Sequence, residues 1–177
     1  MKKENIPATL FINARWIDKN LNTFKTLASN PLFEIANHGL EHKPASVNGK
    51  SIYGLDGSKN IEEFVDEIEL NARKIESITH KRPKYFRSGT AYYDEVAVSV
   101  ANKLNHQVVG FSILGDAGAT FSTKKVEEAF LKAKKGEIVI IHMNHPTSDT
   151  AQGTINAITK LKQKGFKFVK LSDYKLK

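Results

Sequence analysis

The stretch Leu32-Phe33-Glu34-Ile35-Ala36-Asn37-His38-Gly39-Leu40-Glu41-His42 joins a short apolar run directly to two histidines. Its first five residues favour a β-strand, because apolar and β-branched side chains dominate them. The residues that follow, 37–58, combine glycine, proline and histidine without a regular period. A long loop of this kind in a compact domain is typically functional. The sequence therefore predicts a strand that delivers His38 and His42 to its carboxyl end.

Short apolar runs alternate with amphipathic segments over the rest of the chain. The pattern predicts strands at 8–13, 32–36, 85–86, 108–114, 137–143 and 166–171, and helices at 18–29, 60–75, 95–104, 124–134 and 150–164. The strands read as continuous apolar runs, which is typical of parallel strands that are buried on both faces. Alternating strands and helices indicate an α/β architecture, either an open doubly wound sheet or a barrel. The length predicts a single domain over residues 1–177.

Composition excludes several classes of protein. The 177 residues include 27 Lys and Arg against 19 Asp and Glu, a formal charge of +8. The lysine clusters at 132–135 and 160–164 lie where helices are expected to end, so we expect no nucleic-acid partner. The absence of cysteine excludes a disulfide scaffold, a thiolate zinc site and a cysteine nucleophile. No apolar run is long enough to span a membrane, and residues 1–5 precede no apolar signal-peptide core.

Chemically reactive side chains follow several of the predicted strands. In parallel α/β folds the carboxyl ends of the strands form one face, where active sites are built. The sequence therefore predicts one site from the residues that follow strands, which are His38, His42, Arg87, Asp116, His142 and His145.

His38 and His42 are the candidate metal ligands. They are four residues apart, and side chains at this spacing project the same way on a helical turn. Imidazole nitrogens without thiolates suit a divalent cation, zinc above all, with cobalt or nickel as alternatives. The other reading is two loop histidines that bind no metal.

The remaining candidates each have a structural alternative. His142 ends an apolar strand and is either catalytic or a core histidine bonded to backbone. Arg87 either clamps a carboxylate or pairs with a surface acid. Asp116 orients a histidine, binds substrate, or serves as a turn and N-cap residue. Tyr92 either stacks on a sugar ring or packs in the core.

The order of these pieces resembles the NodB-type polysaccharide deacetylases. The similar segments run in the family's order and are Ile6-Pro7-Ala8-Thr9-Leu10-Phe11, Glu34 to His42, Tyr85-Phe86-Arg87-Ser88-Gly89, Val139-Ile140-Ile141-His142 and Lys164-Gly165-Phe166-Lys167-Phe168-Val169. The resemblance implies an irregular (β/α) barrel. It departs from the family pattern in having no Asp-Asp pair, and this pair belongs to the family's first strand. The resemblance thus implies a domain that lacks its first strand, and a barrel edge near residues 8–13 through which the chain could self-associate.

The resemblance also implies roles for individual residues. His38 and His42 would hold the metal, with no third protein ligand visible in the chain. His142 would protonate the leaving amine, Asp116 would tune His142, and Arg87 would orient the base. Substrate would be bound by Gly89, Tyr92 and His145.

The activity implied is metal-dependent removal of N-acetyl or O-acetyl groups from an amino-sugar polysaccharide such as peptidoglycan or a chitin-like glycan. Because the Asp-Asp pair would supply the general base and the third ligand, we expect impaired activity from this chain. The alternative is a non-catalytic carbohydrate-binding protein of the same fold. The resemblance places the protein in the cell envelope or outside the cell.

Overall fold

The computed structural model describes Met1 and residues 4–176, which divide into two compact units. The larger unit is Lys2–Val109 with Val169–Lys177, and the smaller unit is Gly110–Phe168 with Met1. The single domain expected from the sequence stays a prediction. None of the helices in the described residues combines the length and the apolar character needed to cross a membrane.

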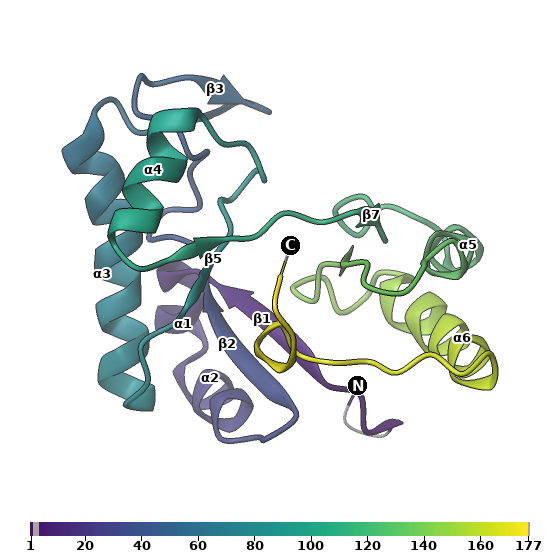
Figure 1. Cartoon of the computed structure of the whole chain (residues 1–177). Coiled ribbons are helices and arrows are strands. Elements are labelled where there is room, and N and C mark those ends of the chain that lie inside the picture. Colours follow the sequence, from purple (N-terminus) through teal and green to yellow (C-terminus); the bar gives the residue numbers. More distant parts are fainter. Residues whose placement is uncertain (2–3, 177) are drawn as a thin grey trace. The chain divides into compact units, whose positions relative to one another are not determined.

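The larger unit is built on a parallel sheet with the strand order β1-β2-β5-β6 (Figure 1). Its strands are β1 (Ala8–Ile12), β2 (Phe33–Asn37), β5 (Tyr85–Phe86) and β6 (Gln107–Val108). The pairing of β1 with β2 runs from Ala8 opposite Phe33 to Ile12 opposite Asn37, so both strands end at the same level. β1 is the edge strand, and four of its five residues are only partly buried. Self-association through this edge stays a prediction.

Four helices cover this sheet: α1 (Ala14–Lys19), α2 (Leu21–Ala28), α3 (Ile61–Thr79) and α4 (Glu95–Lys103). They enclose two apolar clusters. One cluster joins β1, α1, α2 and α3 through Ile12, Ile17, Phe24 and Ile75. The other joins α3, β5 and α4 through Phe64, Ile68, Phe86, Ala97 and Ala101. The long helix α3 therefore belongs to both clusters and connects the two parts of the core of this unit.

Side-chain caps explain where three of these helices begin. Asn13, Asn60 and Asp94 precede α1, α3 and α4, and each side chain accepts a hydrogen bond from a backbone N–H of the first turn. Such caps satisfy N–H groups that the helix itself leaves without partners.

The smaller unit pairs two strands in parallel, β7 (Ile113–Leu114) and β8 (Val139–Ile140), and packs two helices, α5 (Thr123–Leu131) and α6 (Thr150–Gln163). Its core is made of Val126, Phe130, Ala157 and Leu161. The helices approach closely at Gly153, where an added Cβ would lie 2.6 Å from the Thr123 carbonyl oxygen. A side chain at this position would therefore force α5 and α6 apart.

The parallel pairing expected from the sequence is confirmed, but several element boundaries were wrong. No strand forms at 166–171, and a short 3₁₀ turn, η2 (Leu171–Asp173), ends the segment. The reason lies in its hydrogen bonds, because the N–H groups of Leu171 and Ser172 donate to the side chains of Thr9 and Glu34. These N–H groups are therefore satisfied without a strand ladder.

Three other expectations also need correction. The predicted strand at 108–114 is two strands, β6 and β7, which pair in different sheets. The predicted helix at 18–29 is two helices, because Asn20 leaves the helical conformation at φ −135°. The loop at 37–58 contains an antiparallel hairpin of β3 (Ser51–Ile52) and β4 (Leu55–Asp56). Tyr53 and Gly54 turn the hairpin at φ values of 52° and 75°, as a tight two-residue turn requires.

Truncating Phe64 tests the core of the larger unit. Phe64 is fully buried on α3, and its ring centroid lies 6.1 Å from that of Phe86 on β5. We expect Phe64→Ala to lower the free energy of unfolding by about 3–5 kcal/mol, since it leaves a cavity. Urea titration followed by the fluorescence of Trp16, which packs in the same unit, measures this change. Tyr53→Ala is the control, because Tyr53 is 89% exposed and should change stability little.

Candidate active site

The loop after β2 carries the two candidate metal ligands of the larger unit. The rings of His38 and His42 lie 4.7 Å apart, centroid to centroid, with an angle of 86° between their planes. The Nδ1 atom of His38 lies 2.7 Å from the carbonyl oxygen of Arg87. With Nδ1–H donating to this carbonyl, the lone pair of His38 is on Nε2, which is the arrangement that metal-binding imidazoles adopt.

Whether these residues fit a metal depends on the number of donors. Two neighbouring imidazoles with one fixed tautomer are a suitable part of a zinc, cobalt or nickel site. Catalytic zinc sites normally have three protein ligands. Among Met1 and residues 4–176, no group of three or more His, Cys, Asp or Glu side chains is arranged to hold a metal ion. The residues present therefore supply two of the three protein ligands that a catalytic zinc site normally has.

Arg87 follows β5 and is buried beside β1. Its Nε donates to the carbonyl oxygen of Val109 at 3.0 Å, and its guanidinium carbon lies 4.2 Å from the centroid of the Phe11 ring. Burial lowers the pKa of Arg87, against the influence of Tyr93, which raises it. The side chain is thus fixed by packing, while its carbonyl orients His38.

Gly89 and Tyr92, predicted to bind substrate, follow β5, and Gly89 lies against His42. A Cβ on Gly89 would lie 2.0 Å from the carbonyl oxygen of His42, so glycine permits the close approach of these two segments. The Gly89 N–H donates to the Lys43 carbonyl at 3.1 Å. The ammonium of Lys50 lies 4.7 Å from the centroid of the Tyr92 ring. One face of this ring is therefore already engaged, and binding of substrate by either residue stays a prediction.

In the smaller unit, Asp116 and His142 form a hydrogen-bonded pair after β7 and β8. Oδ1 of Asp116 lies 2.8 Å from Nδ1 of His142. Oδ2 of Asp116 accepts from the His142 backbone N–H at 2.6 Å and from the Thr150 hydroxyl at 3.1 Å. Burial alone would raise the pKa of Asp116, but the hydrogen bonds from His142 and Thr150 bring it below its ordinary value. The pair is therefore a buried carboxylate that orients a half-exposed imidazole.

The structure brings the sequence-predicted site residues together in two groups. His38, His42, Arg87, Gly89 and Tyr92 belong to the larger unit, whereas Asp116, His142 and His145 belong to the smaller unit. His145 lies in an exposed turn, where its carbonyl accepts from the Ser148 hydroxyl and N–H. A common site for the two groups, and the role of each residue in it, stays a prediction.

Sequence reasoning missed three buried polar residues behind the His38–His42 loop, namely Asn37, Glu67 and Asn71. Glu67 and Asn71 lie on the buried face of α3, between Phe64 and Ile75. The helical spacing could have predicted their burial, because both positions fall on the same face of the helix as its apolar residues. Burial raises the pKa of Glu67, against backbone hydrogen bonds from Glu41 and Lys43 that lower it.

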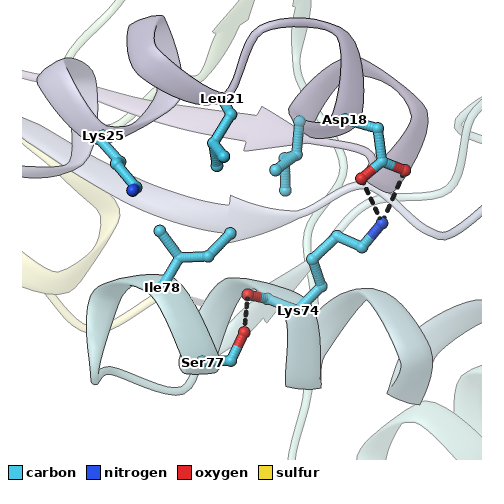
Figure 2. A pocket seen from close by; sticks show the side chains of 7 residues that line it. Asp18, Leu21, Lys25, Lys74, Ser77 and Ile78 are labelled. Atoms are coloured by element: carbon cyan, nitrogen blue, oxygen red, sulfur yellow. Dashed lines mark hydrogen bonds and ion pairs between the residues drawn. The ribbon is translucent and has the colours of Figure 1, made fainter.

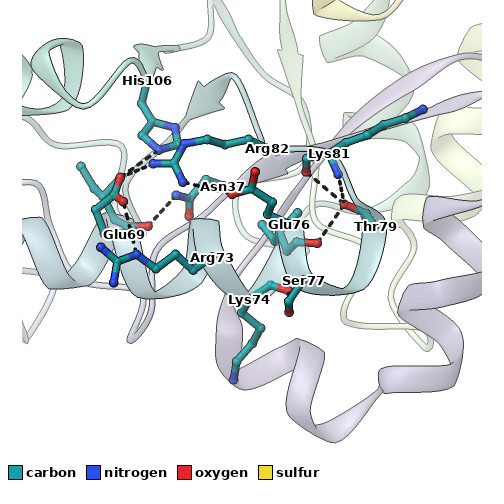
Figure 3. A network of polar contacts seen from close by, with 12 residues as sticks. Asn37, Glu69, Arg73, Lys74, Glu76, Ser77, Thr79, Lys81, Arg82 and His106 are labelled. Atoms are coloured by element: carbon teal, nitrogen blue, oxygen red, sulfur yellow. Dashed lines mark hydrogen bonds and ion pairs between the residues drawn. The ribbon is translucent and has the colours of Figure 1, made fainter.

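A second polar network of the larger unit surrounds His106, to which the sequence assigned no role (Figure 3). Its Nε2 lies 3.7 Å from Oε1 of Glu69, and Glu69 also pairs with Arg82 and Arg73. Burial lowers the pKa of His106, an effect that Arg82 reinforces and Glu69 opposes. This network ties α3 to the segment before β6.

Two shallow grooves lie on the larger unit. One, of about 390 Å³, is lined by His42, Lys43, Glu63 and the β4 residues Leu55 and Asp56, among others. The other, of about 410 Å³, lies between α1, α2 and α3 (Figure 2). In that groove Lys74 donates to both carboxylate oxygens of Asp18, at 2.6 and 2.7 Å. Only the first groove borders a candidate metal ligand.

Comparison with known protein families shows to which family the chain belongs. The polysaccharide deacetylase family matches residues 1–109, which is more than half of the sequence. This chain belongs to the polysaccharide deacetylase family.

Relatives and solved structures extend this likeness beyond residue 109. The peptidoglycan-N-acetylmuramic acid deacetylase PdaA of Bacillus subtilis (strain 168) is 21% identical in an alignment of 178 positions, which covers 98% of this chain and 62% of PdaA. The crystal structure of BA3943, a CE4 family pseudoenzyme from Bacillus anthracis, matches with a TM-score of 0.81 and 24% identity, over 97% of this chain and 56% of that chain.

A further structural match is a family 4 acetyl xylan esterase from Clostridium thermocellum, in complex with a cobalt ion. It has a TM-score of 0.79 and 18% identity, over 97% of this chain and 78% of that chain. These likenesses confirm the predicted fold, the irregular (β/α) barrel of the deacetylase type. The chain spans less than two thirds of the length of PdaA and of BA3943.

Replacing Asp116 by asparagine tests the pair in the smaller unit. The folded-state pKa of Asp116 lies below its ordinary value, so the carboxylate contributes its full stability above that value and loses it as pH falls through the folded-state pKa. We expect Asp116→Asn to cost about 1.5–3 kcal/mol near neutral pH, since hydrogen bonds to a charge are lost. The difference from the wild type should shrink as the pH falls through the ordinary carboxyl pKa of about 3.9 and below it.

Urea unfolding followed by circular dichroism at several pH values measures both effects. Asp56→Asn is the matched control, because this exposed carboxylate lies outside the pair. A pH-independent difference for Asp116→Asn would contradict the assignment of the shift to the ionised carboxylate.

Proposed function

We propose that the chain is the core of a metal-dependent hydrolase that removes acetyl groups from an amino-sugar polysaccharide, with peptidoglycan or a chitin-like glycan as substrate. The observation that carries the proposal is the pair of adjacent imidazoles, His38 and His42, with the tautomer of His38 fixed by the Arg87 carbonyl. Membership of the polysaccharide deacetylase family and the likeness to PdaA support it.

The metal, most readily zinc, would be held by His38 and His42 and would supply Lewis acidity toward an acetamide carbonyl. The chain's own residues would supply orientation and a proton. The His142 imidazole, held at Nδ1 by Asp116, presents Nε2 as a proton donor for a leaving amine. Arg87, buried beside Phe11, holds the carbonyl that orients His38.

A non-catalytic carbohydrate-binding role is the second candidate. Two observations favour it. Among the described residues no third acidic or histidine ligand joins His38 and His42. In addition, BA3943, which shares the fold, is described as a pseudoenzyme. A metal held by two imidazoles would bind weakly, and weak occupancy would limit hydrolysis.

The proposed substrate also suggests where the protein acts. PdaA is named as a peptidoglycan deacetylase, and a glycan of this kind belongs to the cell wall. We therefore propose a location at the cell envelope and a carbohydrate polymer as partner.

Metal binding is the first test of the proposed function. Titration of the 177-residue chain with Co²⁺, followed by visible absorption, should show binding that His38→Ala or His42→Ala weakens by more than about 10-fold. His80→Asn is the control, because His80 is an exposed residue at the end of α3 with φ 56°. Equal Co²⁺ affinity in all four proteins would refute the metal role of the pair.

Acetate release distinguishes the two candidate functions. N-acetylglucosamine oligomers and peptidoglycan fragments are incubated with the chain, with and without Zn²⁺. For a hydrolase we expect slow, zinc-dependent release that His142→Ala lowers by about 10²–10⁴-fold, the usual contribution of general acid–base catalysis. Glycan binding without any release would support the carbohydrate-binding alternative.

A further inference from the structure

One buried carboxylate holds the loop that carries both candidate metal ligands. The N–H of Glu41 lies 3.1 Å from Oε1 and 2.9 Å from Oε2 of Glu67, and the N–H of Lys43 lies 3.0 Å from Oε1. The backbone carbonyl of Glu67 also accepts from the Leu40 N–H at 2.8 Å. One residue of α3 thus binds three backbone N–H groups between His38 and Pro44.

The conformation of the loop explains why its N–H groups converge. Gly39 has a φ of 82° and His42 a φ of 66°. Left-handed residues of this kind turn successive N–H groups toward one point and create a concave site for an anion. Here the anion is the protein's own carboxylate, Glu67, which is 2% exposed.

Gly39 and Glu67 occupy mutually dependent positions. A Cβ built on Gly39 would lie 2.2 Å from Oε1 of Glu67. A side chain at position 39 would therefore displace the carboxylate from the N–H groups that it accepts. Glycine at this position serves two purposes, because it allows the positive φ and leaves space for Glu67.

We propose that Glu67 is a positioning residue that sets the relative orientation of His38 and His42 for a metal ion. The inference rests on the proposed function, in which these two histidines bind the metal. The Glu67 carboxylate accepts hydrogen bonds from the loop backbone. It acts by fixing the backbone on both sides of His42, at residues 41 and 43.

The alternative is a purely structural role, in which Glu67 stabilises the larger unit without affecting the ligands. The two roles predict that loss of the carboxylate affects different parts of the unit. A positioning role requires local disorder of the loop when the carboxylate is lost, whereas the packing of α3 through Phe64, Ile68 and Ile75 should persist. The experiment must therefore separate the loop from the helix.

Amide hydrogen exchange of the metal-free protein provides the first readout. In Glu67→Gln one carboxylate oxygen becomes an NH₂ group that cannot accept the loop N–H groups. We expect the amides of residues 41 and 43 to lose protection by about 10-fold or more, while the amides in the middle of α3 change little. Asp66→Asn is the charge-matched control, since Asp66 is the exposed neighbour on the same helix. Unchanged protection at residues 41 and 43 would overturn the clamp itself.

Co²⁺ affinity provides the second readout. Loss of a residue that orients metal ligands typically lowers affinity by about 10–100-fold, and we expect this loss for Glu67→Gln. Ile75→Ala is the stability-matched control, because it opens the core at the far end of α3 without touching the loop. Wild-type Co²⁺ affinity in Glu67→Gln, with the loop amides exposed, would overturn the positioning role.

A double-mutant cycle tests the pairing of positions 39 and 67. Gly39→Ala should weaken Co²⁺ binding in the wild-type background, where the new methyl group meets the carboxylate. In the Glu67→Ala background the same change should cost clearly less, because only the strain of the positive φ remains. Equal costs in both backgrounds would contradict the steric coupling. If the wild-type chain binds no Co²⁺ at all, the proposed function fails, while the hydrogen-exchange result still decides the clamp.

Discussion

Polar groups at the carboxyl ends of β1 and β2 are buried, and hydrogen bonds with the side chains and backbone of α3 satisfy them. The amide of Asn71 donates to the Ile12 carbonyl at 2.9 Å and to Oδ1 of Asn37 at 2.7 Å. The amide of Asn37 donates to the Ile68 carbonyl at 2.9 Å. Because buried backbone groups without partners are costly, the ends of both strands are specified by these contacts. The rest of the larger unit depends on them, since β5 and the histidine loop continue the same network.

The hydrogen-bond network continues from the end of β2 to the end of β5. The carbonyl of Asn37 accepts from the Arg87 N–H at 3.0 Å, and the Arg87 carbonyl then faces Nδ1 of His38. The buried asparagine at the end of β2 therefore fixes the end of β5, and the end of β5 fixes the first imidazole. The amide donors of this network are paired, and such pairing restricts how the strand ends and α3 can be arranged. This explains why polar residues occupy an otherwise apolar face of α3.

Local patterns in the sequence predicted the elements that depend on local physics. Asn60 and Asp94 cap helices whose periodicity was clear, and β1 and β2 appear within one residue of their expected positions. The strand expected at 166–171 failed because its environment depends on contacts distant in sequence. The segment 166–171 contains strand-forming residues, but side chains of Thr9 and Glu34 satisfy its last N–H groups. The residues that bind this segment lie more than 130 positions away in the sequence. A pattern of neighbouring residues therefore could not predict its conformation.

The candidate site divides in the same way. His38, His42, Arg87, Asp116 and His142 were identifiable from their places after strands. Glu67 was not recognised, because a glutamate on a helix is usually exposed and its partners are backbone N–H groups of a loop 24 to 26 residues away. Gly39 gave no separate signal either, since its need for the absence of a Cβ follows from Glu67.

His38, a candidate metal ligand, and His142, a candidate proton donor, are both oriented by a hydrogen bond at Nδ1, but their partners differ in charge. In both, Nδ1 makes a hydrogen bond, so Nε2 is the candidate reactive nitrogen. The partner of His38 is a neutral carbonyl, which favours the neutral imidazole that a metal requires. The partner of His142 is a buried carboxylate, which can stabilise an imidazolium as it forms during proton transfer. The neutral partner thus suits His38 to metal binding, and the charged partner suits His142 to acid–base chemistry. Each histidine and its partner belong to the same unit.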